Sequence, residues 1–122
     1  MRDVIFEFYI GDTYTRDFTI SGYSSDITEV YFTVKKSNAD KRFVLQKTLE
    51  DGITLTEDTG TGEERTRTYN ILIDADETES LKADFDYSFD IEIVSPNNIK
   101  KTIVTGIFRV NNTTTREYNE GE

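Results

Sequence analysis

The sequence predicts an all-β fold, an antiparallel β-sandwich of about seven short strands with one short helical turn. The clearest observation is in residues 86–110, where two runs of alternating apolar and polar residues flank the turn-forming residues 95–98. The same two-residue alternation recurs along most of the chain. In addition, the chain contains a single proline, and only residues 76–82 have a helical pattern. These three observations predict short strands joined by tight turns.

The remaining strands are predicted from the same pattern. Alternating apolar residues mark four segments, residues 4–10, 18–20, 28–36 and 69–73. In the third of them, Val30, Phe32 and Val34 share one face, and most side chains of the other face are polar. Two further apolar runs, between residues 43 and 55, flank Asp51-Gly52. Because this dipeptide readily supplies the positive φ of a tight hairpin turn, a hairpin is expected there.

One domain is expected, a β-sandwich over residues 1–110, followed by a polar tail, residues 111–122, that should fray. A chain of 122 residues can bury a core without disulfides. Residues 1–10 contain an apolar run, but Asp3 and Glu7 interrupt it, so it is neither a signal peptide nor a membrane span. We therefore expect a soluble protein that is made inside the cell and makes no contact with a membrane.

The composition argues against most catalytic and nucleic-acid-binding classes. Cysteine and histidine are both absent, which removes disulfides, thiol chemistry, the commonest general base and the commonest zinc ligand. The net charge of −10 opposes the binding of nucleic-acid phosphates. We expect no catalytic residues, no metal, no cofactor and no nucleic-acid partner.

The densest acidic cluster consists of Asp74, Asp76, Glu77 and Glu79. Its spacing departs from the EF-hand calcium loop, which needs a glycine at the sixth position, where this chain has Glu79. Asp76 begins the helical segment and Glu79 follows three residues later, which is the spacing of a capping box. We expect Asp76 to cap the helix and Glu79 to close the box, with a calcium site as the alternative.

Asp90 and Glu92 lie on the outward face of the strand that begins near Tyr87. Two neighbouring carboxylates can act as the acid and the base of glycoside hydrolysis, but this requires a cleft and one raised pKa. Outward carboxylates on a strand are far more often its solvated face. The sequence therefore predicts a binding or structural domain rather than an enzyme.

Tyr87 and Leu81 indicate the type of sandwich. Leu81 lies six residues before Tyr87, and Tyr87, Phe89 and Ile91 alternate along the strand that follows. This spacing resembles the tyrosine corner of immunoglobulin-like and fibronectin type III sandwiches, in which the tyrosine hydroxyl bonds to the backbone upstream. The prediction is an immunoglobulin-like sandwich, and the alternative is that Tyr87 is one more core aromatic.

Four apolar residues fall on faces that should be solvated, Tyr31, Leu72, Ile103 and Ile107. They form the candidate protein interface, because exposed apolar patches often mark contacts with another subunit or domain. Two alternatives remain open. A loop or the tail could cover these side chains, or a bulge at Gly106 could exchange the two faces along the last strand.

Short motifs along the chain resemble those of a known class. They are Gly11-Asp12-Thr13, Phe18-Thr19-Ile20, residues 30–36, Asp51-Gly52-Ile53, Leu81 with Asp86-Tyr87, and residues 102–110 with Gly106. In this order, over residues 5–116, they resemble small structural proteins of phages and prophages of Gram-positive bacteria, in particular the N-terminal immunoglobulin-like domain of phage baseplate upper proteins. The resemblance implies a non-enzymatic tail or baseplate component, made in the bacterial cytoplasm and assembled into the virion, that binds other phage structural proteins or further copies of itself. Longer members carry a coiled or fibrous extension that this chain lacks after Arg116, so trimerisation and receptor contact are not carried over.

The alternative function is a carbohydrate-binding or adhesion-type β-sandwich module. Such a module would use exposed aromatic rings as stacking platforms, and the candidates are Tyr9, Tyr14, Tyr23 and Tyr31. The absence of tryptophan argues against this alternative.

Overall fold

The computed structural model describes residues 4–37 and 39–112, and its all-β class confirms the prediction. The strands are β1 (Val4–Tyr9), β2 (Tyr14–Ser21), β3 (Glu29–Lys35), β4 (Leu45–Leu49), β5 (Gly52–Thr59), β6 (Thr66–Ile73), β7 (Phe85–Ser95) and β8 (Ile99–Asn111). A short helix, α1, spans Ala75–Glu79, and two 3₁₀ turns span Gly62–Glu64 and Pro96–Asn98. The last strand ends one residue beyond the predicted domain boundary. Of the predicted tail, residues 113–122 lie outside the described residues.

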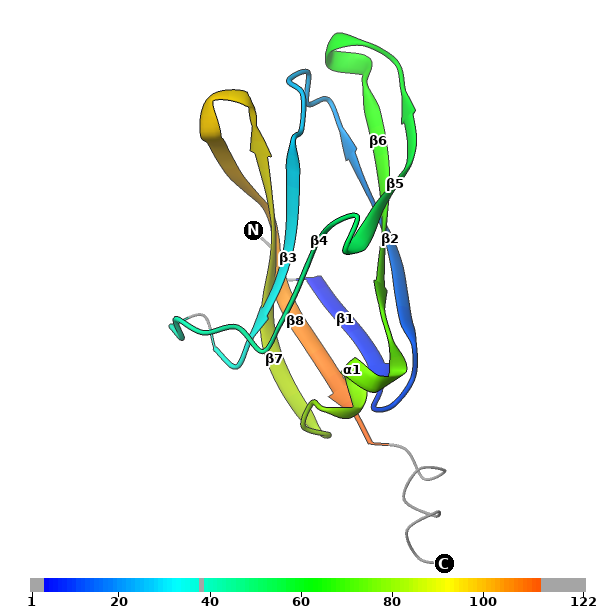
Figure 1. Ribbon diagram of the computed structural model, residues 1–122, viewed down its shortest axis with the longest axis vertical. Coiled ribbons are helices and arrows are strands. Elements are labelled where there is room, and N and C mark those ends of the chain that lie inside the picture. Colours follow the sequence, from blue (N-terminus) through cyan, green and yellow to red (C-terminus); the bar gives the residue numbers. More distant parts are fainter. Residues whose placement is uncertain (1–3, 38, 113–122) are drawn as a thin grey trace, which may run out of the picture.

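The eight strands form one mixed sheet in the order β1-β8-β7-β3-β4-β5-β6-β2, nearly closed into a barrel. Figure 1 shows β7, β3 and β8 on one side and β5, β6 and β2 on the other, with β4 and β1 between them. Two of the pairings are parallel, β1 with β8 and β4 with β5, and the others are antiparallel. An antiparallel, immunoglobulin-like sandwich of seven strands is therefore not confirmed. The parallel β1–β8 pairing joins the two ends of the chain, and alternation within each segment carries no information about it.

The predicted hairpin at Asp51-Gly52 is wrong. The chain turns after β4 and pairs locally in parallel, with Thr48 opposite Gly52 and Leu49 opposite Ile53. Gly52 has the expected positive φ of 100°, but its partner in the left-handed region is Glu50, with a φ of 66°. Because the chain continues in the same direction, this turn carries it from one side of the barrel to the other.

Inward-facing apolar residues fill the barrel. Val30, Phe32 and Val34 of β3 are fully buried, as their shared face predicts. The ring centroids of Phe6 and Phe89 lie 4.4 Å apart, and Phe32 and Phe89 lie 5.4 Å apart, so aromatic rings of three strands meet at the centre of the core.

A buried arginine closes one end of the barrel. Arg67 of β6 is 2% exposed, and its guanidinium donates hydrogen bonds to the carbonyl oxygens of Tyr23, at 3.1 Å, and Ser25, at 2.6 Å. These bonds supply the partners that a buried charged donor requires, and they fix the connection between β2 and β3. Sequence pattern does not predict this burial, because Arg67 occupies an inward position in a strand whose other inward residues are apolar.

Gly106 lies opposite Val4, where β1 begins to pair with β8, and it does not carry the bulge proposed as one alternative. The bulge lies at Ile103, because Ile91 of β7 pairs with Val104 and the next residue, Glu92, pairs with Thr102. A Cβ atom at Gly106 would clash with the carbonyl oxygen of Val4 and lie 2.9 Å from the Phe89 ring. The glycine therefore permits the close approach of β1 to β8.

The capping box of α1 is formed by Asp74 and Glu77, so the predicted assignment to Asp76 and Glu79 is two residues too late. The backbone N–H of Asp74 donates to the Glu77 carboxylate at 3.0 Å. Both pairs have the same D-x-x-E spacing, and the sequence offers no means of choosing between them. The Asp74–Glu77 pair forms the box because β6 ends at Ile73 and α1 begins at Ala75. Asp74 is therefore the extended residue between the strand and the helix, in the N-cap position. No helix in the described ranges is long and apolar enough to cross a membrane.

The hydrogen bond predicted for Tyr87 is present. The backbone N–H of Lys82 donates to the Tyr87 hydroxyl at 2.8 Å, and Tyr87 and Leu81 are both buried. The bond ties the segment after α1 to the start of β7.

Candidate functional site: a groove around Tyr31

The four residues of the predicted interface do not form one surface. Tyr31 stands on the outer face of β3, and Ile107 stands on β8, opposite Ile5 of β1. Leu72 is 43% exposed on β6, on the other side of the barrel. Ile103 is half-buried and packs against the core at the bulge. The outer-face prediction for Ile103 is therefore wrong, because the extra residue changes the direction of its side chain.

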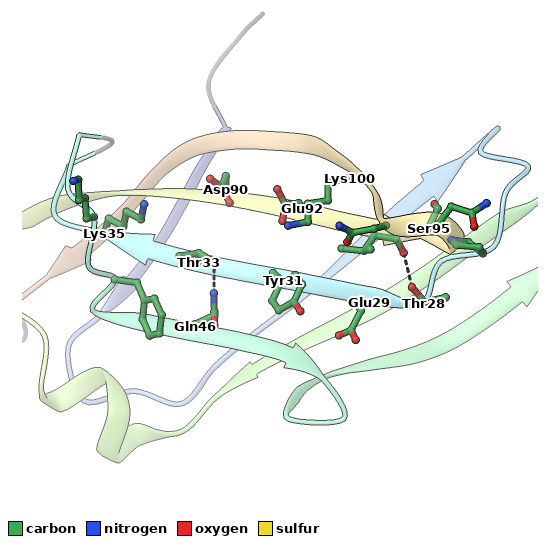
Figure 2. Close-up of a pocket in the computed structure, with 16 residues that line it drawn as sticks. Thr28, Glu29, Tyr31, Thr33, Lys35, Gln46, Asp90, Glu92, Ser95 and Lys100 are labelled. Atoms are coloured by element: carbon green, nitrogen blue, oxygen red, sulfur yellow. Dashed lines mark hydrogen bonds between the residues drawn. The ribbon is translucent and has the colours of Figure 1, made fainter.

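A groove of about 650 Å³ lies on the outer face of β3, β4 and β7, with Tyr31 in its floor. In register, Tyr31 stands opposite Glu92, and Thr33 stands opposite Asp90 on one side and Gln46 on the other. Figure 2 shows Tyr31 in the middle of this grid of side chains. The same alternation that buries the even-numbered residues of β3 thus places the odd-numbered residues in the groove.

Two loops close the ends of the groove. One end is lined by Lys41 and Phe43, which precede β4, and the other by the turn Pro96–Asn98. Asn97 and Asn98 both have positive φ, of 69° and 60°, a conformation that asparagine tolerates better than most residues. Because these loops are far apart in the sequence, alternation along β3 or β7 cannot predict the hollow between them.

The groove contains three carboxylates, Glu29, Asp90 and Glu92, and three ammonium groups, Lys35, Lys41 and Lys100. Their formal charges sum to zero. None of the six forms an ion pair with another described residue. Figure 2 shows Lys35 at one end of the groove, Asp90 beside Thr33, and Lys100 beside Glu92 near the central Tyr31.

The carboxylates of the groove act on one another and on Tyr31. Partial burial raises the pKa of Asp90, and the charge of Glu92 raises it further, against a smaller opposing effect of Lys35. The charge of Glu29 raises the pKa of the Tyr31 phenol, and partial burial, the hydrogen bond to Glu29 and the charge of Glu92 add to this. The centre of the groove therefore presents oxygen atoms that accept hydrogen bonds.

Asp90 and Glu92 occupy the outward face of β7, as predicted, but this face is partly covered. The groove that holds them is open to solvent along its length. A general acid and base work best in a site that excludes water, which an open groove on a sheet does not provide. Of the two conditions for an acid and base pair, the raised pKa is present at Asp90, whereas the cleft is an open groove.

The four tyrosines considered as stacking platforms differ in exposure. Tyr31 lies in the groove, and Tyr9 is 55% exposed on β1. Tyr14 is buried, so its prediction as an exposed platform is wrong. Burial also raises the pKa of the Tyr14 phenol, although Arg16 opposes this, and the hydroxyl has no hydrogen bond of good geometry. The Tyr23 hydroxyl is held by the Ser95 hydroxyl at 2.6 Å.

The acidic cluster considered for calcium has other contacts. Glu77 binds the ammonium of Lys47 through both carboxylate oxygens, at 2.8 and 2.6 Å, in addition to its role in the capping box. Within residues 4–37 and 39–112, no group of three or more acidic residues is arranged to hold a metal ion.

Comparison with protein-family models finds no match for the chain, and comparison with curated proteins finds no match either. The functional argument therefore depends on the residues themselves and on their arrangement.

Proposed function

We propose that the chain is a non-enzymatic structural module of a phage or prophage particle, a tail or baseplate component that binds neighbouring particle proteins or further copies of itself. The short motifs described above support this assignment by resemblance. The hydrogen bond between Tyr87 and Lys82 supports the finer proposal that the barrel is a variant of the immunoglobulin-like sandwich.

The observation that carries the proposal is an apolar pair beside an open sheet edge. Ile5 is 43% exposed, stands directly opposite Ile107, and has the 36% exposed Val4 beside it. In the described part of the chain, β1 pairs with β8 on one side and has no strand on the other. Edge strands that avoid association usually carry charges or prolines. An apolar edge fits a strand that contacts another protein.

Two pairs of polar side chains on this face are already joined, and Tyr9 on the same face is 55% exposed. Arg109 binds Asp86 at 2.9 Å, and the Asn111 amide donates to Glu7 at 2.8 Å. These contacts hold the polar side chains to one another, so the apolar and aromatic side chains are the part of the face that gains most from being covered.

The proposal is tested by co-expression with any tail or baseplate proteins that are found encoded beside the gene, followed by size-exclusion chromatography with light scattering. Ile5→Thr and Ile107→Thr should weaken co-elution while the purified variants remain folded, because threonine keeps β-branching but removes apolar area. Leu72→Thr is the matched control, because Leu72 has the same exposed fraction as Ile5, 43%, on the other side of the barrel.

If none of these proteins co-elutes with the unaltered chain and the chain alone stays monomeric, the assembly proposal fails. Equal weakening by Leu72→Thr would show that the apolar pair has no special role.

A further inference from the structure

The groove around Tyr31 has the composition of a site for a ligand with many hydroxyl groups. Tyr31 supplies an aromatic ring in the floor, and Phe43, 52% exposed, supplies a second ring at one end. Rings of this kind stack against the apolar faces of sugar rings, and the hydroxyls at the rim of each sugar then point toward the surrounding polar groups.

Those polar groups have free hydrogen-bonding capacity. The Gln46 amide donates to the Thr33 hydroxyl at 3.0 Å, which orients the amide and leaves its carbonyl oxygen as an acceptor. The carboxylates of Asp90 and Glu92 have no ion-pair partner among the described residues. Each ionised carboxylate can accept several bonds from ligand hydroxyls.

The net charge of the groove indicates whether a cationic, an anionic or a neutral ligand fits it best. With three carboxylates and three ammonium groups, the groove has no net charge with which to select a cation or an anion. A neutral ligand whose hydroxyls donate to carboxylates and accept from ammonium groups uses both kinds of group. The volume of about 650 Å³ lies within the usual range for small-molecule sites, roughly 300–1,000 Å³.

We infer that this groove binds a neutral oligosaccharide, with Tyr31 as the stacking platform and Glu92, Asp90 and Gln46 as hydrogen-bond partners. The inference goes beyond the assembly role and does not depend on it, because the groove involves β3, β4 and β7, whereas the proposed contact lies on β1 and β8.

The test begins with the full chain on an array of neutral hexose and N-acetylhexosamine oligosaccharides, with charged glycans and basic peptides on the same surface. Calorimetry with the best neutral ligand then compares variants. Tyr31→Ala should weaken binding by about tenfold or more, since it removes the ring. Tyr31→Phe keeps the ring and should retain most of the affinity. Tyr9→Ala, which removes a ring that is 55% exposed outside the groove, should leave it unchanged.

The salt dependence of the affinity distinguishes a neutral ligand from a charged one. Raising the ionic strength from about 50 mM to about 500 mM should change the affinity for a neutral saccharide little, because screening acts on interactions between charges. Glu92→Gln, which keeps one acceptor oxygen, should weaken binding only moderately.

Three results would overturn the inference: no neutral oligosaccharide bound on the array, affinity unaffected by Tyr31→Ala, or binding confined to charged ligands and lost at high salt. The assembly proposal and the saccharide proposal can fail independently of each other. Tyr31→Ala should leave co-elution with the particle proteins intact, and Ile5→Thr should leave saccharide affinity intact.

Discussion

The hydroxyl of Tyr87 accepts a hydrogen bond of 2.8 Å from the backbone N–H of Lys82 and thereby joins the segment after α1 to the beginning of β7. Tyr87 is only 4% exposed, so water cannot readily replace the bond. Its removal would leave a backbone donor without this partner.

Tyr87→Phe should therefore lower the free energy of unfolding by roughly 1 kcal/mol while the ring packing is retained. Urea denaturation of the variant measures this, with Tyr9→Phe as a control at an exposed ring. An unchanged midpoint would reduce Tyr87 to a core aromatic.

Glu77 predicts a pH dependence of stability. Burial alone would raise its pKa, but hydrogen bonds from the Lys47 ammonium and the Asp74 backbone outweigh burial and hold the pKa below its ordinary value of 4.5. A carboxyl whose pKa is lower in the folded state stabilises the fold above its unfolded pKa, and this contribution disappears as the pH falls through the folded pKa.

Part of the loss of stability below about pH 4.5 should therefore be absent in Glu77→Gln. The measurement is the urea midpoint between neutral and acidic pH. Glu79→Gln is the matched control, because Glu79 has the same D-x-x-E spacing from Asp76 but stands outside the capping box. If the two variants had the same pH profile, the assignment of the box to Asp74 and Glu77 would be in error.

Gly106→Ala should destabilise the pairing of β1 with β8. The added methyl group would meet the Val4 carbonyl oxygen and the Phe89 ring, so one of the two strands must shift. We expect a cost of roughly 1–3 kcal/mol in thermal or urea unfolding. Thr105→Ala, at the exposed neighbouring position, is the control. Equal stability of the two variants would contradict the close approach of β1.

Ile103 and Ile107 should respond differently to threonine, although the alternation in the sequence groups them. Ile103 packs against the core at the bulge, so Ile103→Thr should cost roughly 1–2 kcal/mol. Ile107→Thr should cost less, because Ile107 stands on the outer face opposite the exposed Ile5. A larger cost for Ile107→Thr would place it in the core and remove it from the proposed contact.

Alternation within a segment predicts which side chains of that segment face the core. It identifies Val30, Phe32 and Val34 as core residues, and the spacing of Leu81 and Tyr87 predicts the hydrogen bond upstream. It does not predict the parallel pairing of Val4 with Gly106, because the two residues are far apart in the chain. The groove around Tyr31 depends on two distant loops for the same reason. The capping box is missed because two overlapping D-x-x-E pairs compete, and the end of β6 decides between them.

The central claim, that the chain is a component of a phage particle, is tested most directly by quantitative mass spectrometry of particles purified on a density gradient from cells that carry the gene. The account predicts that the chain accompanies the tail or baseplate proteins in a fixed ratio through the gradient. Detection of the chain only in the soluble lysate, with intact particles that lack it, would contradict the account.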